Sequence, residues 1–257
     1  MIEFAHCKWE EIQGHVEDHV RKHNITVESF WEDHVLKSNH YKIIADNKLA
    51  GYFAIHKESM ITLFNVFHSI AGQSQEIFAR VKRYEQVTNA MVATGDEFFL
   101  SHCFDSFSRI EKQAYFAIFT ERDMPEEKQK DIRMRLMDID SDEPGMFEDF
   151  LDGIIDEMRK GADYTEVYTA EHEGDVVGCG VIDYGRIIKD AASIGMYVRP
   201  EYRRRGIAAN ILRQMKSVAN SKGCRAFAGC WYYNHNSKKS MESAGAYIKT
   251  RLMKFYF

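Results

Sequence analysis

The stretch that decides the fold of this chain is Val198–Ala208, VRPEYRRRGIA. The residues that lead into it, Ala191–Val198, predict a β-strand, and those that leave it, Ile207–Ser221, have the apolar spacing of an amphipathic helix. The stretch is therefore a strand-to-helix turn that carries three successive arginines and a glycine. Backbone N–H groups at a helix start have no acceptor within the helix, and the helix dipole adds positive potential there. We expect the turn to bind an anion.

Two small residues make this turn suitable for a phosphate. Gly206 lets the backbone approach a ligand closely, and Ala208 keeps the first helical turn open. Together with the arginine side chains they form a pyrophosphate cradle. The alternative is an ordinary loop with surface arginines.

The elements around this turn are those of a mixed α/β domain. Because a helix connects the strand that ends at Val198 to the next one, these two strands are expected to be parallel. A tight turn is predicted at Glu173-Gly174. The predicted strands are Ile132–Ile139, Tyr164–Glu171, Asp175–Tyr184, Ala191–Val198, Ala226–Tyr232 and Tyr247–Phe257, and the predicted helices are Pro144–Arg159, Ile207–Ser221 and Ser237–Ser243.

The N-terminal half repeats this order, with a hairpin around Asn47-Lys48. The segment Asn47–Gly51 falls where Gly174–Gly178 falls in the second half. We therefore predict two tandem domains, residues 1–122 and 123–257, each a central mixed β-sheet flanked by helices, with a charged connector at Glu121–Lys130. The predicted strands of this half are Ile2–Cys7, Tyr41–Ala45, Leu49–His56, Met60–Phe67, Thr88–Thr94 and Ala114–Thr120.

Composition narrows the class of protein. With 45% hydrophobic and 28% charged residues, the 257-residue chain can bury a core. It has no secretory signal and no apolar run of the ~20 residues that cross a bilayer, so a cytoplasmic protein without a membrane partner is expected. The five cysteines are scattered, which favours reduced thiols. The net charge of −5 argues against nucleic acid as a partner.

The charge is unevenly distributed. Between Asp138 and Asp183 there are fifteen acidic and two basic residues, whereas Arg199 to Lys254 holds thirteen basic and two acidic ones. This pattern indicates either two solvated faces, or a basic lobe for an anionic ligand beside an acidic lobe for a cationic one.

The pattern Arg-x-x-Gly-x-Ala after a strand resembles the acyl-CoA-binding segment of the GNAT superfamily, Arg/Gln-x-x-Gly-x-Gly/Ala. The resemblance extends over Ile132–Phe257. It implies an N-acetyltransferase that moves an acetyl group from acetyl-CoA, as co-substrate, to a primary amine of a small acceptor.

The resemblance also implies roles for single residues. The turn residues Arg203, Arg204, Arg205, Gly206, Ile207 and Ala208 would bind the pyrophosphate of CoA. Tyr197 and Val198 would lie along the pantetheine arm, and the backbone N–H of Met196 would stabilise the oxyanion. Asn234 matches an asparagine near CoA, with Ser237 beside it. Asn234 equally fits a helix cap before Ser237.

The catalytic acid departs from the family pattern. Met241 stands where members often have a tyrosine that protonates the departing thiolate. Ser240 is one substitute, with Ser237, Tyr233 and Tyr247 as others. The thiolate can also leave unassisted, because its pKa is near ~8.5.

The position of the catalytic base also differs from the family pattern. Ala192 replaces a glutamate that some members carry, which leaves Asp183 as the nearest carboxylate. The alternatives are an exposed strand-end role for Asp183, a water relay, or an acceptor amine that arrives neutral.

The first half lacks the cradle. Counting from Val66 as the partner of Val198, Ala71 replaces Arg203 and Ser74 replaces Gly206, so no arginine remains in that turn. This half is predicted to be a degenerate copy.

The acidic stretch motivates a cationic acceptor, such as a polyamine, an amino sugar or a lysine-like amine. Two other functions stay open: a non-catalytic acyl-CoA-binding or regulatory module, and a protein N-acetyltransferase. His15, His19 and His23 lie four residues apart on a predicted helix, a spacing that can hold a metal ion. The charged residues around them indicate a solvent-exposed helix face instead, so no metal is expected.

Overall fold

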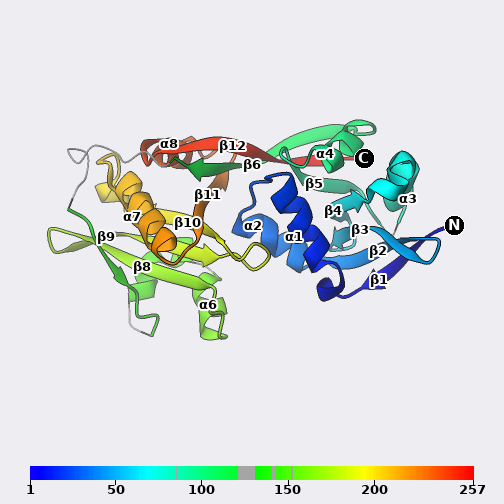
Figure 1. Ribbon diagram of the computed structural model, residues 1–257. Coiled ribbons are helices and arrows are strands. Elements are labelled where there is room, and N and C mark those ends of the chain that lie inside the picture. Colours follow the sequence, from blue (N-terminus) through cyan, green and yellow to red (C-terminus); the bar gives the residue numbers. More distant parts are fainter. Residues whose placement is uncertain (85, 121–130, 141–142, 152) are drawn as a thin grey trace. The chain divides into compact units, whose positions relative to one another are not determined.

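The computed structural model describes residues 1–84, 86–120, 131–140, 143–151 and 153–257 (Figure 1). It divides into two compact units: unit 1 is Met1–Tyr115 with Thr250–Phe257, and unit 2 is Phe116–Lys249. The connector predicted at Glu121–Lys130 and the boundary predicted between residues 122 and 123 lie outside the described residues.

Unit 1 is a mixed sheet in the order β1-β2-β3-β4-β5-β12-β6, with β6 up to Tyr115 and β12 from Thr250. The pairs β1–β2, β2–β3, β3–β4 and β5–β12 are antiparallel, and the pair β4–β5 is parallel. The elements are β1 (Ile2–Cys7), η1 (Trp9–Glu11), α1 (Gln13–Lys22), α2 (Ser29–Leu36), β2 (Asn39–Ala45), β3 (Lys48–His56), β4 (Met60–Val66), η2 (His68–Gln73), α3 (Ser74–Val81), β5 (Asn89–Ala93), α4 (Glu97–Phe104), β6 (Arg109–Phe119) and β12 (Ala246–Tyr256).

Unit 2 has the sheet order β12-β6-β11-β10-β9-β8-β7, with the first part of β12 and the last part of β6. Strands β7 to β10 are antiparallel neighbours, and β10 and β11 are parallel, as predicted. The elements are β7 (Arg133–Leu136), η4 (Glu143–Phe147), α5 (Glu148–Leu151), α6 (Ile154–Arg159), β8 (Thr165–His172), β9 (Asp175–Tyr184), β10 (Ala191–Val198), η5 (Pro200–Tyr202), α7 (Ile207–Ser221), β11 (Arg225–Trp231) and α8 (His235–Ser243).

The sheet of unit 2 has a helical layer on each face. Helices α7 and α8 cover a core that includes Ile194, Ile211 and Met215, because the apolar residues of α7 recur every three or four positions. Helices α5 and α6 cover the opposite face over Phe147 and Val181. The predicted fold class, mixed α/β with helices flanking a sheet in each of two tandem domains, is confirmed.

The predicted internal repeat is visible in two glycines. Gly51 pairs with Val66, and Gly178 pairs with Val198. A Cβ on Gly51 would lie 2.4 Å from the carbonyl oxygen of Asn65, and one on Gly178 would lie 2.2 Å from that of Tyr197. Both positions therefore need glycine for the same close backbone contact, which supports the predicted equivalence of Val66 and Val198.

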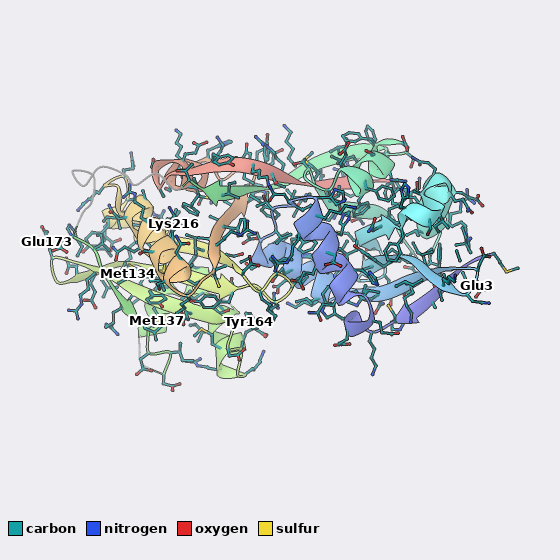
Figure 2. All side chains as sticks on the ribbon, viewed as in Figure 1. Glu3, Met134, Met137, Tyr164, Glu173 and Lys216 are labelled. Atoms are coloured by element: carbon teal, nitrogen blue, oxygen red, sulfur yellow. The ribbon has the colours of Figure 1, made fainter. Side chains whose placement is uncertain are left out.

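The hairpin turns agree with the prediction in unit 2 and shift by one residue in unit 1. Glu173 and Gly174 both have positive φ, 52° and 88°, and Glu173 lies at the tip of the β8–β9 hairpin (Figure 2). In unit 1 the turn residues are Asp46 and Asn47, with φ of 50° and 61°, rather than Asn47-Lys48. Asp and Asn tolerate this left-handed conformation better than lysine does.

The single helix predicted over Pro144–Arg159 is wrong in its continuity. Gly153 adopts φ of 76° and separates α5 from α6. No helix in the described part of the chain is long and apolar enough to cross a membrane.

Candidate active site

The turn between β10 and α7 has the backbone of an anion site. Arg204 and Gly206 both have positive φ, 62° and 81°, in a segment that alternates between left-handed and ordinary conformations. Such alternation turns successive N–H groups to one side. Gly206 precedes the first residue of α7 and offers no side-chain cap. A Cβ on Gly206 would meet nothing within 4 Å, so the space beside the backbone of Gly206 is open.

The arginines of the turn differ in what they contact. Arg203 donates from Nε to the carbonyl oxygen of Val198 at 2.9 Å, and its guanidinium lies 5.5 Å from the centroid of the Tyr197 ring. The guanidinium of Arg205 lies 5.5 Å from the ring centroid of Tyr202. Within the described residues, the side chain of Arg204 has no hydrogen-bond or ion-pair partner. Arg203 therefore braces the turn, and Arg204 is available to an anion.

Strands β10 and β11 diverge just before this turn. Their parallel register joins Ala191–Ser193 to Arg225–Phe227. The N–H of Arg199 donates to Val177 of β9 at 3.0 Å. Because N–H directions alternate along a strand, the N–H groups of Val198 and Met196 point away from β9, toward β11. Met196 lies beyond the paired register, so its N–H faces the space where the strands separate.

Asp183 lies in a polar row across three strands of unit 2. Thr165 of β8 pairs with Asp183 of β9, which pairs with Ser193 of β10. The Thr165 hydroxyl donates to Oδ1 of Asp183 at 2.6 Å. Since Val181 belongs to the core under α5 and α6, Asp183 two residues later lies on the same face. Sequence reasoning found Asp183 but missed Thr165, because only the strand register brings the two together.

Helix α8 holds the remaining predicted side chains. Asn234 accepts a hydrogen bond from the Ser237 N–H at 3.1 Å, so it caps α8, one of its two predicted roles. The Ser240 hydroxyl donates to the carbonyl of Asn236 at 3.0 Å. Met241 is buried in the core that α7 and α8 cover. The position at which the resemblance implies a tyrosine therefore faces that core.

A stacked aromatic pair on the α5 side was also missed. The rings of Phe150 and Tyr197 stack at 5.6 Å and 29°. A Cβ on Gly195 would lie 3.8 Å from the tip of Phe150. The pair therefore forms a wall beside the part of β10 that contains Met196.

Comparison with family models identifies this arrangement. The model described as Acetyltransferase (GNAT) family matches residues 107–246, and the one described as Acetyltransferase (GNAT) domain matches residues 8–121. The chain belongs to the GNAT acetyltransferase family. It has two GNAT domains in tandem, and the family uses an acyl-CoA donor.

Solved GNAT structures have the same fold over the whole chain. A GNAT-family acetyltransferase from Colwellia psychrerythraea matches with a TM-score of 0.81 at 15% identity, over 99% of both chains. A tandem GNAT protein from the clavulanic acid biosynthesis pathway matches with 0.62 at 10% identity, over 99% of this chain and 98% of that one. The glucosamine N-acetyltransferase region of a fungal GH3 beta-N-acetylglucosaminidase matches with 0.63 at 12% identity, over 99% of this chain and 38% of that one. No curated protein matches the chain.

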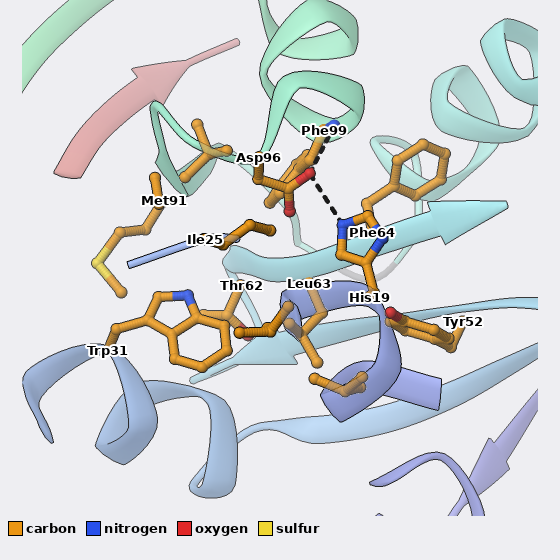
Figure 3. Close-up of a pocket in the computed structure, with 14 residues that line it drawn as sticks. His19, Ile25, Trp31, Tyr52, Thr62, Leu63, Phe64, Met91, Asp96 and Phe99 are labelled. Atoms are coloured by element: carbon orange, nitrogen blue, oxygen red, sulfur yellow. Dashed lines mark hydrogen bonds and ion pairs between the residues drawn. The ribbon is translucent and has the colours of Figure 1, made fainter. Parts of the chain in front are cut away.

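The N-terminal GNAT domain differs at the equivalent place. Its turn after β4 is η2, and α3 begins at Ser74, with no arginine between them. Strands β4 and β5 also diverge, after the pair Ile61–Ala90. The space is filled by side chains from both strands and from α1, α2 and α4, around a cavity of about 10 Å³, room for roughly one water molecule (Figure 3).

His19 and Asp96, two of the residues that line this cavity, contact each other. His19 Nε2 lies 3.2 Å from Oδ1 of Asp96, which also accepts the N–H of Phe99 at the start of α4 (Figure 3). The contact therefore joins His19 of α1 to Asp96, the N-cap residue of α4. In the described part of the chain, no three His, Cys, Asp or Glu side chains are placed to hold a metal ion.

Proposed function

We propose that unit 2 transfers an acetyl group from acetyl-CoA to the primary amine of a small acceptor. The observation that carries this proposal is the open backbone cradle at Arg204 and Gly206, joined directly to the strand whose Met196 N–H faces the β10–β11 divergence. Acyl-CoA carries both a pyrophosphate and a thioester carbonyl. The pyrophosphate would lie in the cradle, and the carbonyl would lie where β10 and β11 diverge.

The donor would be held largely by backbone. The N–H groups from Arg204 to Ala208 would donate hydrogen bonds to the pyrophosphate, with the Arg204 side chain adding charge, while the N–H of Arg203 donates to the carbonyl oxygen of Pro200 at 3.3 Å. The pantetheine arm would lie beside Tyr197 and pair with the N–H of Val198, like a strand added at an edge. Asn234 and Ser237 would border the arm from the start of α8.

The chemistry would be direct attack. The amine nitrogen forms a bond to the thioester carbon, the C–S bond breaks, and CoA leaves as a thiolate. The Met196 N–H would stabilise the oxyanion of the tetrahedral intermediate. Asp183 would take the proton that the amine loses, directly or through water. Ser240 is a candidate donor to the thiolate, although its hydroxyl is also bonded to the Asn236 carbonyl.

The acceptor would be a cation when free in solution. The half-buried Asp183 lies on the face of the sheet opposite α7, and it is the last residue of the acidic stretch Asp138–Asp183. Polyamines, amino sugars and lysine-like amines all fit this charge. The glucosamine named for the fungal relative belongs to the same class.

Unit 1 would not hold acyl-CoA. Its turn after β4 has no arginine, and its strand divergence is filled by side chains. We propose that the N-terminal domain is a degenerate copy.

The test is release of CoA thiol from acetyl-CoA, followed with and without each of a panel of primary amines. Amine-dependent release, with acetylated amine found by mass spectrometry, establishes the enzyme. Binding of acetyl-CoA without turnover of any amine or peptide would favour a non-catalytic module, which the core-facing Met241 and the absence of a carboxylate at Ala192 support. Turnover of peptides alone would indicate a protein N-acetyltransferase.

A further inference from the structure

Trp231 is a largely exposed aromatic side chain of unit 2. It is the last residue of β11 and is 62% exposed, and the nearby Tyr233 is 54% exposed. Their rings lie 5.0 Å apart at 62°, edge to face. An indole left largely in water at a strand end is costly unless something covers it, and exposed aromatic patches commonly mark binding surfaces.

The strand pattern places Trp231 on the side of the sheet that carries α5 and α6. Ala226, Ala228 and Cys230 pack with the core under α7 and α8. Because side chains alternate along a strand, Trp231 points to the opposite face. That face also holds the stacked pair of Phe150 and Tyr197.

Trp231 lies at nearly the same height as the proposed oxyanion site. Strands β10 and β11 are last paired at Ser193 and Phe227. Met196 is three residues beyond one of these positions, and Trp231 is four beyond the other. At about 3.3 Å per residue, the two advance along their strands to within roughly one residue of each other. An acceptor that meets the thioester near Met196 from the α5 side would therefore lie on the same face of the sheet and at about the same height as the Trp231 ring.

Trp231 and Tyr233 present exposed aromatic rings on this face of the sheet, whereas α8 packs through Met241 on the core of the opposite face. A ring with a flat apolar face would cover the exposed indole more completely than a linear chain can.

We propose that the acceptor carries its primary amine on a ring with a flat apolar face, and that this ring stacks on Trp231. The inference rests on the proposed function and names the substrate class of the same site. The C–H face of an amino sugar and the π face of an arylalkylamine share this chemistry. A linear alkylamine or diamine has no such face.

The experiment compares four amines, glucosamine, 2-phenylethylamine, hexylamine and 1,6-diaminohexane, with the full-length protein and saturating acetyl-CoA. The variants are Trp231→Ala and Trp231→Phe. The matched control is Phe107→Ala, which removes one ring of an edge-to-face exposed pair in unit 1, Phe104–Phe107. Comparison of glucosamine with 2-phenylethylamine shows whether the site prefers a sugar ring or an aromatic ring.

We expect at least one ring amine to be preferred over both linear amines. Trp231→Ala should raise KM for that amine by about 10-fold, while KM for linear amines changes by less than about twofold. Trp231→Phe should restore most of the loss, and Phe107→Ala should leave all four unchanged. The affinity for acetyl-CoA should be kept in every variant.

Preference for a linear amine, or an equal rise in KM for all amines in Trp231→Ala, would overturn the ring proposal and leave the acetyltransferase proposal intact. If no amine is turned over, the proposed function fails. In that case ring amines are titrated in the presence of CoA while tryptophan fluorescence is recorded. A quench that Trp231→Phe abolishes supports the ring site, and an unchanged signal overturns it.

Discussion

The Nε of Arg203 donates to the carbonyl oxygen of Val198 across 2.9 Å, so the last residue of β10 is tied to the turn that follows it. The same guanidinium lies over the Tyr197 ring at 5.5 Å. This contact sets the turn in which Arg204 and Gly206 take left-handed conformations. Arg203 is therefore expected to shape the cradle as well as to add charge to it.

Replacement of Arg203 should separate these two effects. Arg203→Lys keeps the charge but loses the planar donor that reaches Val198, and Arg203→Ala loses both. A hydrogen bond from a charged group contributes about 1.5–3 kcal/mol, so we expect Kd for acetyl-CoA to rise about 10-fold or more in the lysine variant and further in the alanine variant. Calorimetric titration measures both. Equal binding by Arg203→Lys and the wild type would show that only charge matters here.

Replacements of Gly206 give a second test of the cradle. One replacement adds only backbone strain, and the other adds a negative charge as well. Any side chain at φ of 81° is strained, by about 1–2 kcal/mol, but the space around a Cβ is open. Gly206→Ala should thus fold and bind acetyl-CoA with modest loss. Gly206→Glu places a carboxylate where the pyrophosphate would lie.

For Gly206→Glu we expect Kd for acetyl-CoA to rise by about 100-fold or more, whereas a carboxylate at a helix N-terminus does not by itself destabilise the fold. Calorimetry on both variants, with circular dichroism as the folding control, gives the comparison. One site per chain that is lost only in Gly206→Glu is the expected result. A site that survives in both would place the donor elsewhere, with unit 1 as the first alternative.

Some elements of unit 2 were predictable to the residue. The bounds of β9, β10 and α7 agree with the prediction because the apolar pattern of each is bounded at both ends by glycine, proline or polar residues. The turn between β10 and α7 was predictable for the same reason, since its arginines and Gly206 are consecutive in the chain, and its role as a pyrophosphate cradle stays a prediction. Local pattern is sufficient where a site is built from one turn.

The acceptor side was not predictable, because its contacts join distant segments. The bond from Thr165 to Asp183 depends on the register of β8 and β9, and the stack of Phe150 on Tyr197 depends on how α5 lies on the sheet. Spacing also identified Met241 as the residue at the tyrosine position, but not that its side chain is buried in the core. Periodicity does not report the partner across a sheet.

The assignment of Asp183 as base has a direct kinetic test. Asp183→Asn removes the proton acceptor at nearly constant shape, and general-base catalysis contributes about 10²-fold or more. We expect kcat to fall by that amount, while Kd for acetyl-CoA is unchanged. Thr165→Val removes only the hydroxyl donor 2.6 Å from Oδ1 and should lower kcat less.

The dependence of kcat on pH distinguishes a catalytic role of Asp183 and Thr165 from a merely structural one. If Asp183 is the base, the acidic limb of kcat against pH should vanish in Asp183→Asn and shift in Thr165→Val. Thermal unfolding of both variants provides the folding control. An Asp183→Asn enzyme within about twofold of the wild type would mean that the proton leaves by water and that Asp183 has a strand-end role.

Two buried histidines of unit 1 predict how stability depends on pH. Burial lowers the pKa of His40, whose Nε2 lies 2.9 Å from the carbonyl oxygen of Val35. Burial also lowers the pKa of His56, and the ring of His34, 4.9 Å away, acts in the same direction. Both imidazoles are therefore neutral in the folded protein at pH values where an unfolded histidine, with a pKa of about 6.5, begins to take a proton.

Because the unfolded chain binds these protons first, the free energy of unfolding should be constant above about pH 6.5 and fall as the pH drops below it. Urea unfolding at pH 7.5 and 5.5 measures this change. His40→Gln and His56→Gln, which cannot titrate, should each lose less stability between the two pH values than the wild type. His68→Gln, at an exposed position of the same unit, should lose as much as the wild type does. An equal loss in all four proteins would assign the acid sensitivity to carboxylates rather than to these two histidines.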